Sequence, residues 1–390
     1  MSPAPAARQK TEPRIAIACD ALTAFTEQER IVEEVIDVIG HAFNLGPIYT
    51  LLADKKLSLP PHLSEAMLTE NVRVSPLATT PGAKSLRRLR PWAVDKLSDQ
   101  LEVDHASEPI DLVVSVARGY IKGIDAPADA RHLCYCTEIN RDVWDTASGK
   151  QGSLDEKLRD WDRRCISNVD SFLASSRFTA EQIQRVYGRD TRVVYPPVRT
   201  DFFVREKGVK REDFWLIAGY HEENPKSALA VEAAMDAGKR AIVVGDGPGV
   251  AALKKHAKSH AKHLAKVGLG KKRDVLIDFA GRVPDEQLAG MYRRAALTLV
   301  TEDDRFPVHA GEAQSCGCPV IAPRQGGAAE MVLEGRTGAF FPEPTTEAIR
   351  AAVKRCPEGV DEQCRAAAKR FSKTVFTEDL LTAIRDTMTA

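Results

Sequence analysis

The sequence has no excess of charge of either sign, and it has no long apolar run. Lysine plus arginine and aspartate plus glutamate number 55 each in 390 residues, so the chain as a whole offers no field that attracts a polyanion. Its longest apolar runs, such as DLVVSVA at 111–117, have the length of buried strands and fall short of the ~20 residues that span a bilayer. We therefore expect no nucleic acid among its partners and a cytoplasmic location, with at most peripheral contact at the inner face of a membrane.

Cysteine is present but lacks the spacing of a zinc site. The eight cysteines include two C-x-C pairs, at 134–136 and 316–318, whereas structural zinc sites favour C-x2-C. Alternate residues of a strand share a face, so such a pair suits a strand with buried, reduced thiols. We predict no metal site and no cofactor.

Two segments are rich in lysine and arginine. In the first, KSLRRLR at 84–90, an exposed helix surface is the simpler interpretation, and anionic lipid headgroups are the alternative partner. In the second, residues 253–273, three histidines lie at i, i+4 and i+7 on one helix face: His256, His260 and His263. Lysines surround them and no carboxylate or cysteine joins them, so we predict a solvated basic helix rather than a metal site.

Short β-rich runs alternate with longer amphipathic segments, which is typical of βαβ units around parallel sheets. The alternation starts with RIAIAC at 14–19 and restarts at 215–219, after the charged stretch VREKGVKRED. We predict an α/β fold of two facing Rossmann-like domains with the active site in the cleft between them, because open α/β sheets bind ligands at the carboxyl ends of their strands. The predicted parts are a disordered tail at 1–13, a first domain at 14–203, a linker at 204–213, a second domain at 214–375 and a C-terminal helix at 376–390.

The most informative segment is TEDDRFPVHAGEAQSCGCPVIAPRQGGAAEMV at 301–332. A predicted strand at 297–300 ends in an acidic cluster, and Gly311–Glu312 then opens a short helix. The free N–H groups and the positive dipole end of such a helix suit a diphosphate, and the Glu312 carboxylate suits the two hydroxyls of a ribose. Alternatively, Glu312 is only a favourable charge in a first helical turn.

This segment resembles family 4 of the glycosyltransferases, which have the GT-B fold, and in particular bacterial polysaccharide mannosyltransferases that read roughly EDFGIxPVEAQACGxPVIAxxxGGxxETV. The matching residues are Phe306, Glu312, Ala313, Gln314, Cys316–Gly317, Pro319–Ala322, Gly326–Gly327, Glu330 and Val332. The resemblance extends over nearly the whole chain, through FLASSRFTAEQIQRVYGRDTRVVYPPVRTDFF at 172–203, YCTEINRDVWD at 135–145, VVGDGP at 243–248 and GRVPDEQLAGMY at 281–292.

The resemblance implies a retaining, metal-independent glycosyltransferase that moves a sugar from a nucleotide-sugar, such as a GDP-mannose-like donor, to a polysaccharide or glycolipid acceptor. It places the acceptor on the first domain and the donor on the second. Asp304 and Glu312, eight positions apart, take the places of the family's two catalytic acids. The implied donor-binding residues are Lys226, His221, Gly245, Gly247, Gly281, Arg282, Val283, Pro284, Phe306, Val308, His309 and Gln314, and the implied acceptor-side residues are Thr26, Glu27, Thr137 and Arg141.

Several positions differ from the family pattern. Thr26 and Glu27 replace two glycines of the family's first loop, Thr137 replaces a histidine near the reacting centre, and His221 replaces an arginine. Pro307 replaces a glycine, so one backbone N–H is lost. The alternative hypothesis is therefore a catalytically weak relative that binds a nucleotide-sugar or acts as a scaffold. A nicotinamide dehydrogenase is disfavoured, because no G-x-G-x-x-G follows the first strand.

Overall fold

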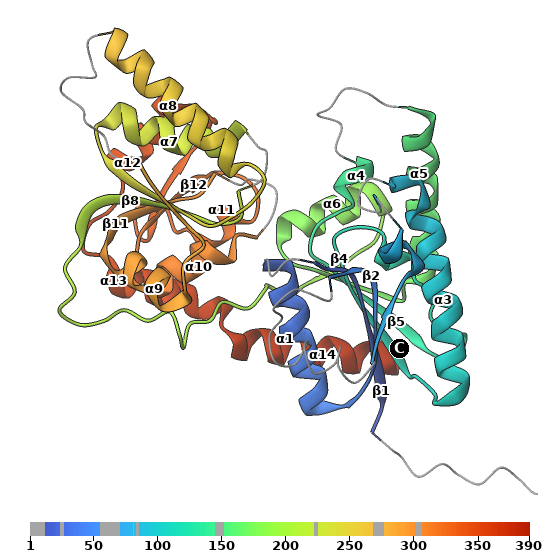
Figure 1. The fold of residues 1–390 in the computed structure, drawn as a ribbon. Helices are drawn as coiled ribbons and strands as arrows, with labels where there is room; N and C mark the ends of the chain where they lie inside the picture. Colours follow the sequence, from blue (N-terminus) through green and yellow to red (C-terminus); the bar gives the residue numbers. More distant parts are fainter. Residues whose placement is uncertain are drawn as a thin grey trace, which may run out of the picture. The chain divides into compact units, whose positions relative to one another are not determined.

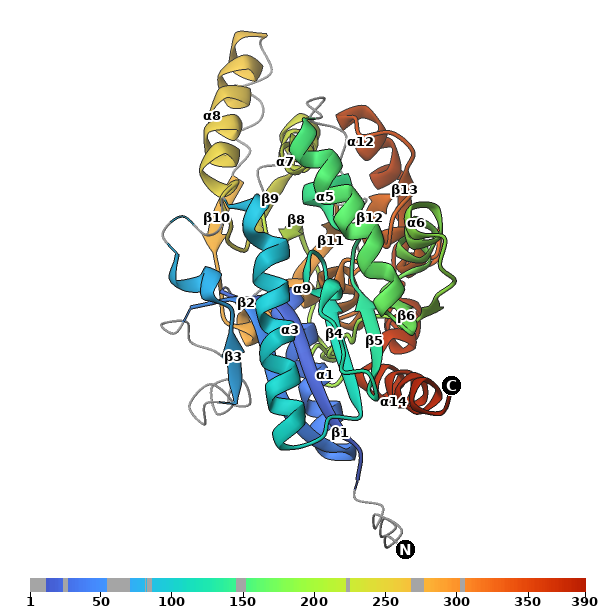
Figure 2. The same ribbon diagram turned by 90° about the vertical axis from the view of Figure 1, so that its right-hand side faces the viewer.

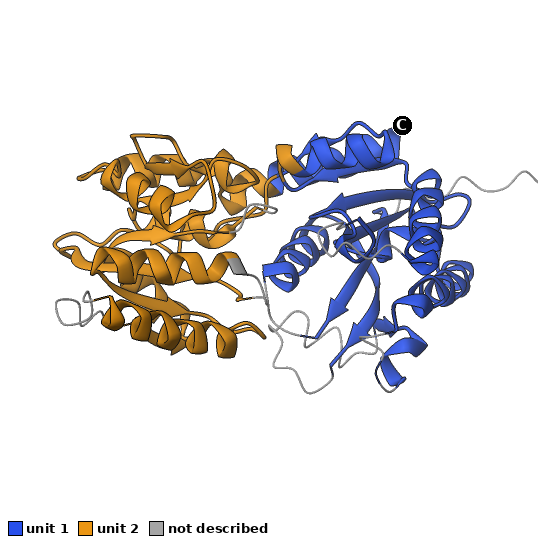
Figure 3. Cartoon of the chain, turned by 90° about the horizontal axis from the view of Figure 1, so that it is seen from above, with its two compact units in different colours: residues 1–175, 179–194, 377–390 blue, residues 176–178, 195–376 orange. Residues whose placement is uncertain are grey.

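The computed structural model describes residues 12–23, 27–54, 71–80, 82, 86–144, 152–221, 225–267, 277–301 and 306–390. The chain forms two compact units, shown in two colours in Figure 3. Unit 1 comprises residues 1–175, 179–194 and 377–390, and unit 2 comprises residues 176–178 and 195–376.

Unit 1 is built on a parallel sheet (Figure 1), and its strand order is β3-β2-β1-β4-β5-β6-β7. The strands are β1 (Arg14–Leu22), β2 (Asn44–Ala53), β3 (Val72–Val74), β4 (Leu112–Ala117), β5 (Arg131–Cys136), β6 (Ser171–Ala174) and β7 (Arg192–Val193). The helices are α1 (Glu27–Ala42), α3 (Arg90–Ser107), α4 (Arg141–Trp144), α5 (Ser153–Arg164), α6 (Arg177–Tyr187) and the greater part of α14 (Lys373–Thr389).

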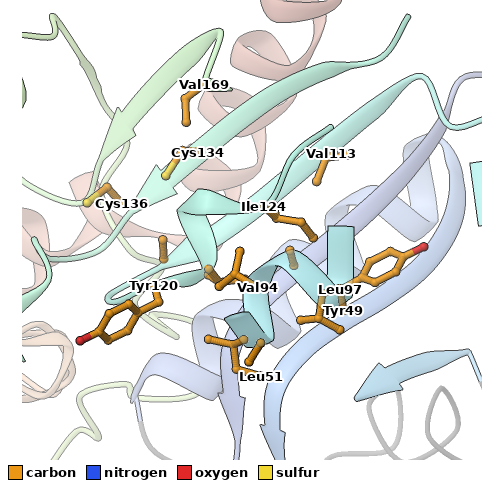
Figure 4. Packing of buried hydrophobic residues seen from close by; sticks show 14 of the residues in the cluster. Tyr49, Leu51, Val94, Leu97, Val113, Tyr120, Ile124, Cys134, Cys136 and Val169 are labelled. Atoms are coloured by element: carbon orange, nitrogen blue, oxygen red, sulfur yellow. The ribbon is translucent and has the colours of Figure 1, made fainter. Parts of the chain in front are cut away.

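The core of unit 1 lies between its sheet and the helices that cover it. β4 is buried at all six positions, as expected for a central parallel strand covered on both faces. α3 lies beside β2 (Figure 2), and Val94 and Leu97 of α3 share one buried cluster with Tyr49 and Leu51 of β2 (Figure 4). Full burial of such side chains contributes roughly 1.5–3 kcal/mol each.

Unit 2 is built on a second parallel sheet, with the strand order β10-β9-β8-β11-β12-β13. The strands are β8 (Glu212–Ala218), β9 (Arg240–Val244), β10 (Ile277–Gly281), β11 (Ala295–Leu299), β12 (Val320–Pro323) and β13 (Gly338–Phe341). The helices are α7 (Pro225–Ala237), α8 (Val250–Lys266), α9 (Asp285–Arg294), α10 (Val308–Ser315), α11 (Ala328–Met331), α12 (Thr346–Lys354) and α13 (Asp361–Ala368). When these six strands are numbered along the chain from β8, their order in the sheet is 3-2-1-4-5-6, which is the order of a Rossmann sheet.

The continuous part of unit 2 begins at Tyr195, nine residues before the predicted linker at 204–213. Phe203 is fully buried in the core of unit 2, so the chain has joined that unit before residue 204. The charged stretch 204–213 is anchored as well, because its two arginines bind one carboxylate of the same unit: Arg205 and Arg211 pair with Asp361.

The strand with which the predicted alternation starts, RIAIAC at 14–19, is present as β1 and extends to Leu22, and the strand predicted at 297–300 overlaps β11. The predicted C-terminal helix is also present, although it starts three residues earlier, at Lys373. In the ranges that the structure describes, no helix is both long enough and apolar enough to cross a membrane.

Candidate functional site

The strand order of unit 2 reverses between β8 and β11, which are neighbours in the sheet. From β8 the chain continues to β9 and β10 on one side, and from β11 to β12 and β13 on the other. Such a reversal leaves a crevice at the carboxyl ends of the two strands, where open α/β sheets bind their ligands. Two segments flank it: residues 219–221 after β8, and the path from β11 to α10.

The first segment packs tightly against the glycine turn after β9. His221 is buried, its N–H donates to the carbonyl of Asp246 (2.8 Å), and its carbonyl accepts from Gly249 (2.9 Å). Its Nε2 lies 3.1 Å from the Val244 carbonyl. Since a carbonyl only accepts, this nitrogen carries the proton. The imidazole of His221, which the resemblance implies to be a donor-binding group, is thus hydrogen-bonded inside the loop.

At two positions of this turn there is no room for a side chain, so glycine is required. Gly245 and Gly247 have φ values of 125° and 136°, which favour glycine. A Cβ on Gly245 would lie 1.8 Å from the carbonyl oxygen of Gly219, and a Cβ on Gly247 would lie 2.3 Å from that of His221. Packing of the loop backbones therefore explains both glycines without any contact to a ligand.

Lys226 lies in the first turn of α7. In a βα unit, the helix after a strand starts near the carboxyl end of that strand, so Lys226 belongs to the same edge of the sheet as His221. Its side chain is half-buried. The intervening residues 222–224 lie outside the described ranges.

α10 begins at Val308, so the prediction that Gly311–Glu312 opens the helix is wrong. Glu312 lies in the second turn, away from the first-turn N–H groups of the helix. All eight residues of α10 are buried. Its sequence therefore lacks the alternation of polar and apolar residues that marks a surface helix. Glu312 is only 4% exposed.

An arginine that the sequence analysis did not single out lies beside Glu312. Arg199 Nη2 is 3.5 Å from Glu312 Oε1, and Arg199 Nη1 donates to Asp285 Oδ2 at 2.9 Å. Burial lowers the pKa of Arg199, but the hydrogen bond to Asp285 and the charge of Glu312 outweigh it and raise the pKa above its usual value. In the sequence, the only local feature that marks Arg199 is its position three residues before two phenylalanines, in RTDFF.

The loop after β10 continues the same edge of the sheet. The Gly281 carbonyl accepts from Gly245 N–H at 2.9 Å, which joins this loop to the glycine turn. Arg282 and Pro284 are exposed, and Val283 packs partly against the core. Pro284 directly precedes α9.

Other predicted donor residues lie in the core of unit 2. The Phe306 ring packs on Tyr195 and Phe371, with ring centroids 5.3 and 5.1 Å away. Gln314 Nε2 donates to the Thr337 hydroxyl at 3.1 Å. Val308 and His309, at the start of α10, are also buried. Residues 302–305, among them Asp304, lie outside the described residues.

In unit 1, Thr137 follows β5 and its hydroxyl lies 2.8 Å from Gln28 Oε1 of α1. Nearby, Glu138 pairs with Arg118 (3.0 Å) and more loosely with Arg141 (3.9 Å). Glu27 is the first residue of α1, while Thr26 lies outside the described residues. The sequence analysis singled out Thr137 and Arg141 but missed the residues that they contact.

At the strand-order reversal of unit 1, between β1 and β4, backbone N–H groups bind a carboxylate of the same unit. Asp20 of β1 accepts four backbone N–H groups of the loop after β4, from residues 118–121, at 2.8–3.1 Å. These donors are therefore used by the protein's own carboxylate.

The remaining sequence features have local partners. The expectation that no carboxylate joins the histidines of α8 is wrong, because α7 supplies two: His256 pairs with Glu232 (2.5 Å) and His260 with Asp236 (2.8 Å). Among the described residues, no group of three or more His, Cys, Asp or Glu is placed to hold a metal ion. In the basic run at 84–90, Arg87 pairs with Asp155. The cysteines are free thiols, and burial raises the pKa of Cys134 to about 12.

Residues 219–358 match the family model of glycosyl transferases group 1, and this stretch lies wholly in unit 2. The chain is 28% identical over 203 residues to a D-inositol 3-phosphate glycosyltransferase from Kribbella flavida, covering 46% of this chain and 46% of that protein. The chain thus spans about half the length of the curated relatives it matches.

Solved structures share the fold over nearly the whole chain. A sucrose-phosphate synthase from Thermosynechococcus elongatus superposes with a TM-score of 0.71 at 15% identity, over 96% of this chain and 98% of that one. HepE from Anabaena, in complex with UDP-glucose, superposes with a TM-score of 0.64 at 14% identity, over 95% and 99%. These likenesses confirm the predicted α/β fold with two Rossmann-like domains, as in GT-B glycosyltransferases.

Proposed function

Because residues 219–358 match the group 1 glycosyl transferases, we propose that the chain is a retaining glycosyltransferase that needs no metal and moves a sugar from a nucleotide-sugar to a polysaccharide or glycolipid acceptor. The observation that carries this proposal is the position of Glu312. It is a buried carboxylate beside the strand-order reversal of unit 2, on the helix that follows β11.

Each segment of this edge has a proposed role. Glu312 accepts hydrogen bonds from the ribose hydroxyls, and the partly exposed loop 281–284 contacts the base. Lys226 and the positive dipole end of α10 face the diphosphate. When the bond between the sugar and the diphosphate breaks, negative charge grows on the leaving group, and fixed cations and N–H dipoles stabilise it without a metal ion.

The base and the sugar are proposed from the relatives. HepE is described in complex with UDP and with UDP-glucose, so UDP-sugars are the first donors to test and GDP-mannose is the second. On the acceptor side, Thr137 and Arg141 follow the carboxyl end of β5, which is where an acceptor would meet the sheet of unit 1.

The test is a donor screen with two readouts. The full chain is incubated with UDP-glucose, GDP-mannose and related nucleotide-sugars, with glycan and glycolipid acceptors, and with or without EDTA. We expect release of nucleoside diphosphate and a glycosylated product of unchanged anomeric configuration, at the same rate with EDTA. Binding of a donor without hydrolysis or transfer would instead support the catalytically weak binding protein, and inhibition by EDTA would contradict metal independence.

A further inference from the structure

Arg199 lies between the two helices whose starts frame the proposed donor site. Its guanidinium contacts Asp285, the first residue of α9, and Glu312 in the second turn of α10. It also lies over the rings of Phe202 and Phe203, with its central carbon 5.2 and 4.9 Å from their centroids. Two carboxylates and two aromatic faces fix the orientation of this one side chain.

The backbone before Arg199 is held against α10. Val198 is fully buried, and its N–H donates to the Phe371 carbonyl at 2.7 Å. A Cβ on Gly311 would lie 2.5 Å from Val198 Cγ2. The glycine next to Glu312 therefore permits the close approach that brings Arg199 to this carboxylate.

The separation of Arg199 and Glu312 suits a carboxylate that must also bind something else. At 3.5 Å, the contact is longer than the 2.7–2.9 Å of a charge-assisted hydrogen bond. It supplies compensating charge, without which a buried carboxylate is strongly disfavoured. The shorter bond of Arg199 goes to Asp285, directly after the loop 281–284.

We propose that Arg199 is a positioning residue of the donor site: it holds the Glu312 carboxylate ready for the ribose hydroxyls and, through Asp285, fixes its place relative to the loop that contacts the base. This inference rests on the proposed function, and it adds a residue from the segment before β8. Arg199 acts on the nucleotide only through Glu312 and Asp285.

The experiment measures how strongly the site senses the ribose hydroxyls. Dissociation constants of UDP and of 2′,3′-dideoxy-UDP are measured by calorimetry with the full chain, or of the GDP pair if only GDP binds. The proteins are the parent, Glu312→Gln, Arg199→Met and the double variant. The parent should bind UDP about 10- to 100-fold more tightly than the analogue, from the strength of hydrogen bonds to a charged group.

Arg199→Met should lose most of this preference, as Glu312→Gln does. In the Glu312→Gln background, Arg199→Met should change the ratio of the UDP and analogue dissociation constants less than about 2-fold, because Arg199 affects the ribose hydroxyls only through Glu312. The matched control is Arg240→Met. Arg240 also pairs with an aspartate and lies over a phenylalanine ring, but at the start of β9, the opposite end of the sheet.

The outcomes separate the inference from the proposed function. If the parent binds neither UDP nor GDP, both are overturned. If the parent binds and Glu312→Gln removes the ribose preference, but Arg199→Met keeps it, only the inference is wrong. The same holds if Arg199→Met weakens UDP and the analogue equally, or weakens binding as much without Glu312 as with it, because Arg199 then serves only the packing of unit 2.

Discussion

Single residues decide how closely the loops of unit 2 approach one another. Gly245 sits where the turn after β9 meets the backbone after β8, and Gly311 sits where α10 meets Val198. Neither position leaves room for a side chain. These glycines set the shape of the edge at which Glu312 and Lys226 lie.

Gly245→Ala should destabilise unit 2 by about 3 kcal/mol or more, because the new Cβ would meet a carbonyl oxygen at 1.8 Å and φ is 125°. Gly290→Ala is the control. Gly290 lies inside α9 with open space around it, so alanine should stabilise the helix by roughly 0.5–1 kcal/mol. Chemical denaturation measures both; equal effects of the two substitutions would show that the loop tolerates a side chain.

Substitutions of Asp304 test the catalytic role that the family resemblance implies for this residue. If it replaces the family's first acid, its carboxylate reaches about 1.5 Å less far than a glutamate would. Asp304→Glu should then maintain or raise the rate of sugar transfer, and Asp304→Asn should abolish it. Transfer at the parental rate by Asp304→Asn would remove this residue from the mechanism.

At the scale of helices and strands, burial fixes the protonation of individual groups. His132 of β5 is fully buried, with Nδ1 3.1 Å from the Asn168 carbonyl and Nε2 2.8 Å from the Ser115 hydroxyl. Since the carbonyl only accepts, Nδ1 carries the proton and Nε2 accepts from Ser115. Burial lowers the pKa of His132 to about 4.

This pKa predicts an acid sensitivity of unit 1. Because the folded value lies below the unfolded one of ~6.5, His132 stabilises the fold above pH ~6.5, and this stability is lost as the pH falls toward 4. Between pH 7 and 4.5 the loss should be about 2–3 kcal/mol. His132→Asn should flatten this part of the unfolding profile, whereas exposed His263→Asn should not. An unchanged slope in His132→Asn would contradict the assignment.

The elements that could be predicted from the sequence are those with a local signal. Strands such as β9 are apolar runs between turn residues, and their bounds follow from that pattern. α10 has no polar face because every residue is buried, so its start was misplaced. Glu312 was found by its resemblance to the family, whereas Arg199 lies 113 residues from Glu312 and 86 from Asp285, and no local pattern links them.

At the scale of the whole molecule, the two units differ in the functional features that they carry. Unit 2 carries the match to the glycosyl transferases group 1 and the candidate donor site. In unit 1, Asp20 occupies the N–H groups at the strand-order reversal, and the acceptor that we propose for this unit would bind side chains such as those of Thr137 and Arg141. The central claim concerns unit 2: it binds the nucleoside diphosphate of the donor.

Thermal unfolding with UDP, GDP and ADP tests that claim most directly. At ~100-fold above its dissociation constant, a nucleotide adds about 2.7 kcal/mol to the unit that binds it, which for a unit of this size raises the melting temperature by roughly 5–10 °C. We predict this rise with UDP or GDP for the parent and for the surface variant His263→Ala. Glu312→Gln should need about 10- to 100-fold more nucleotide for the same rise. No shift with any of the three nucleotides, or an equal shift in Glu312→Gln, would contradict the account.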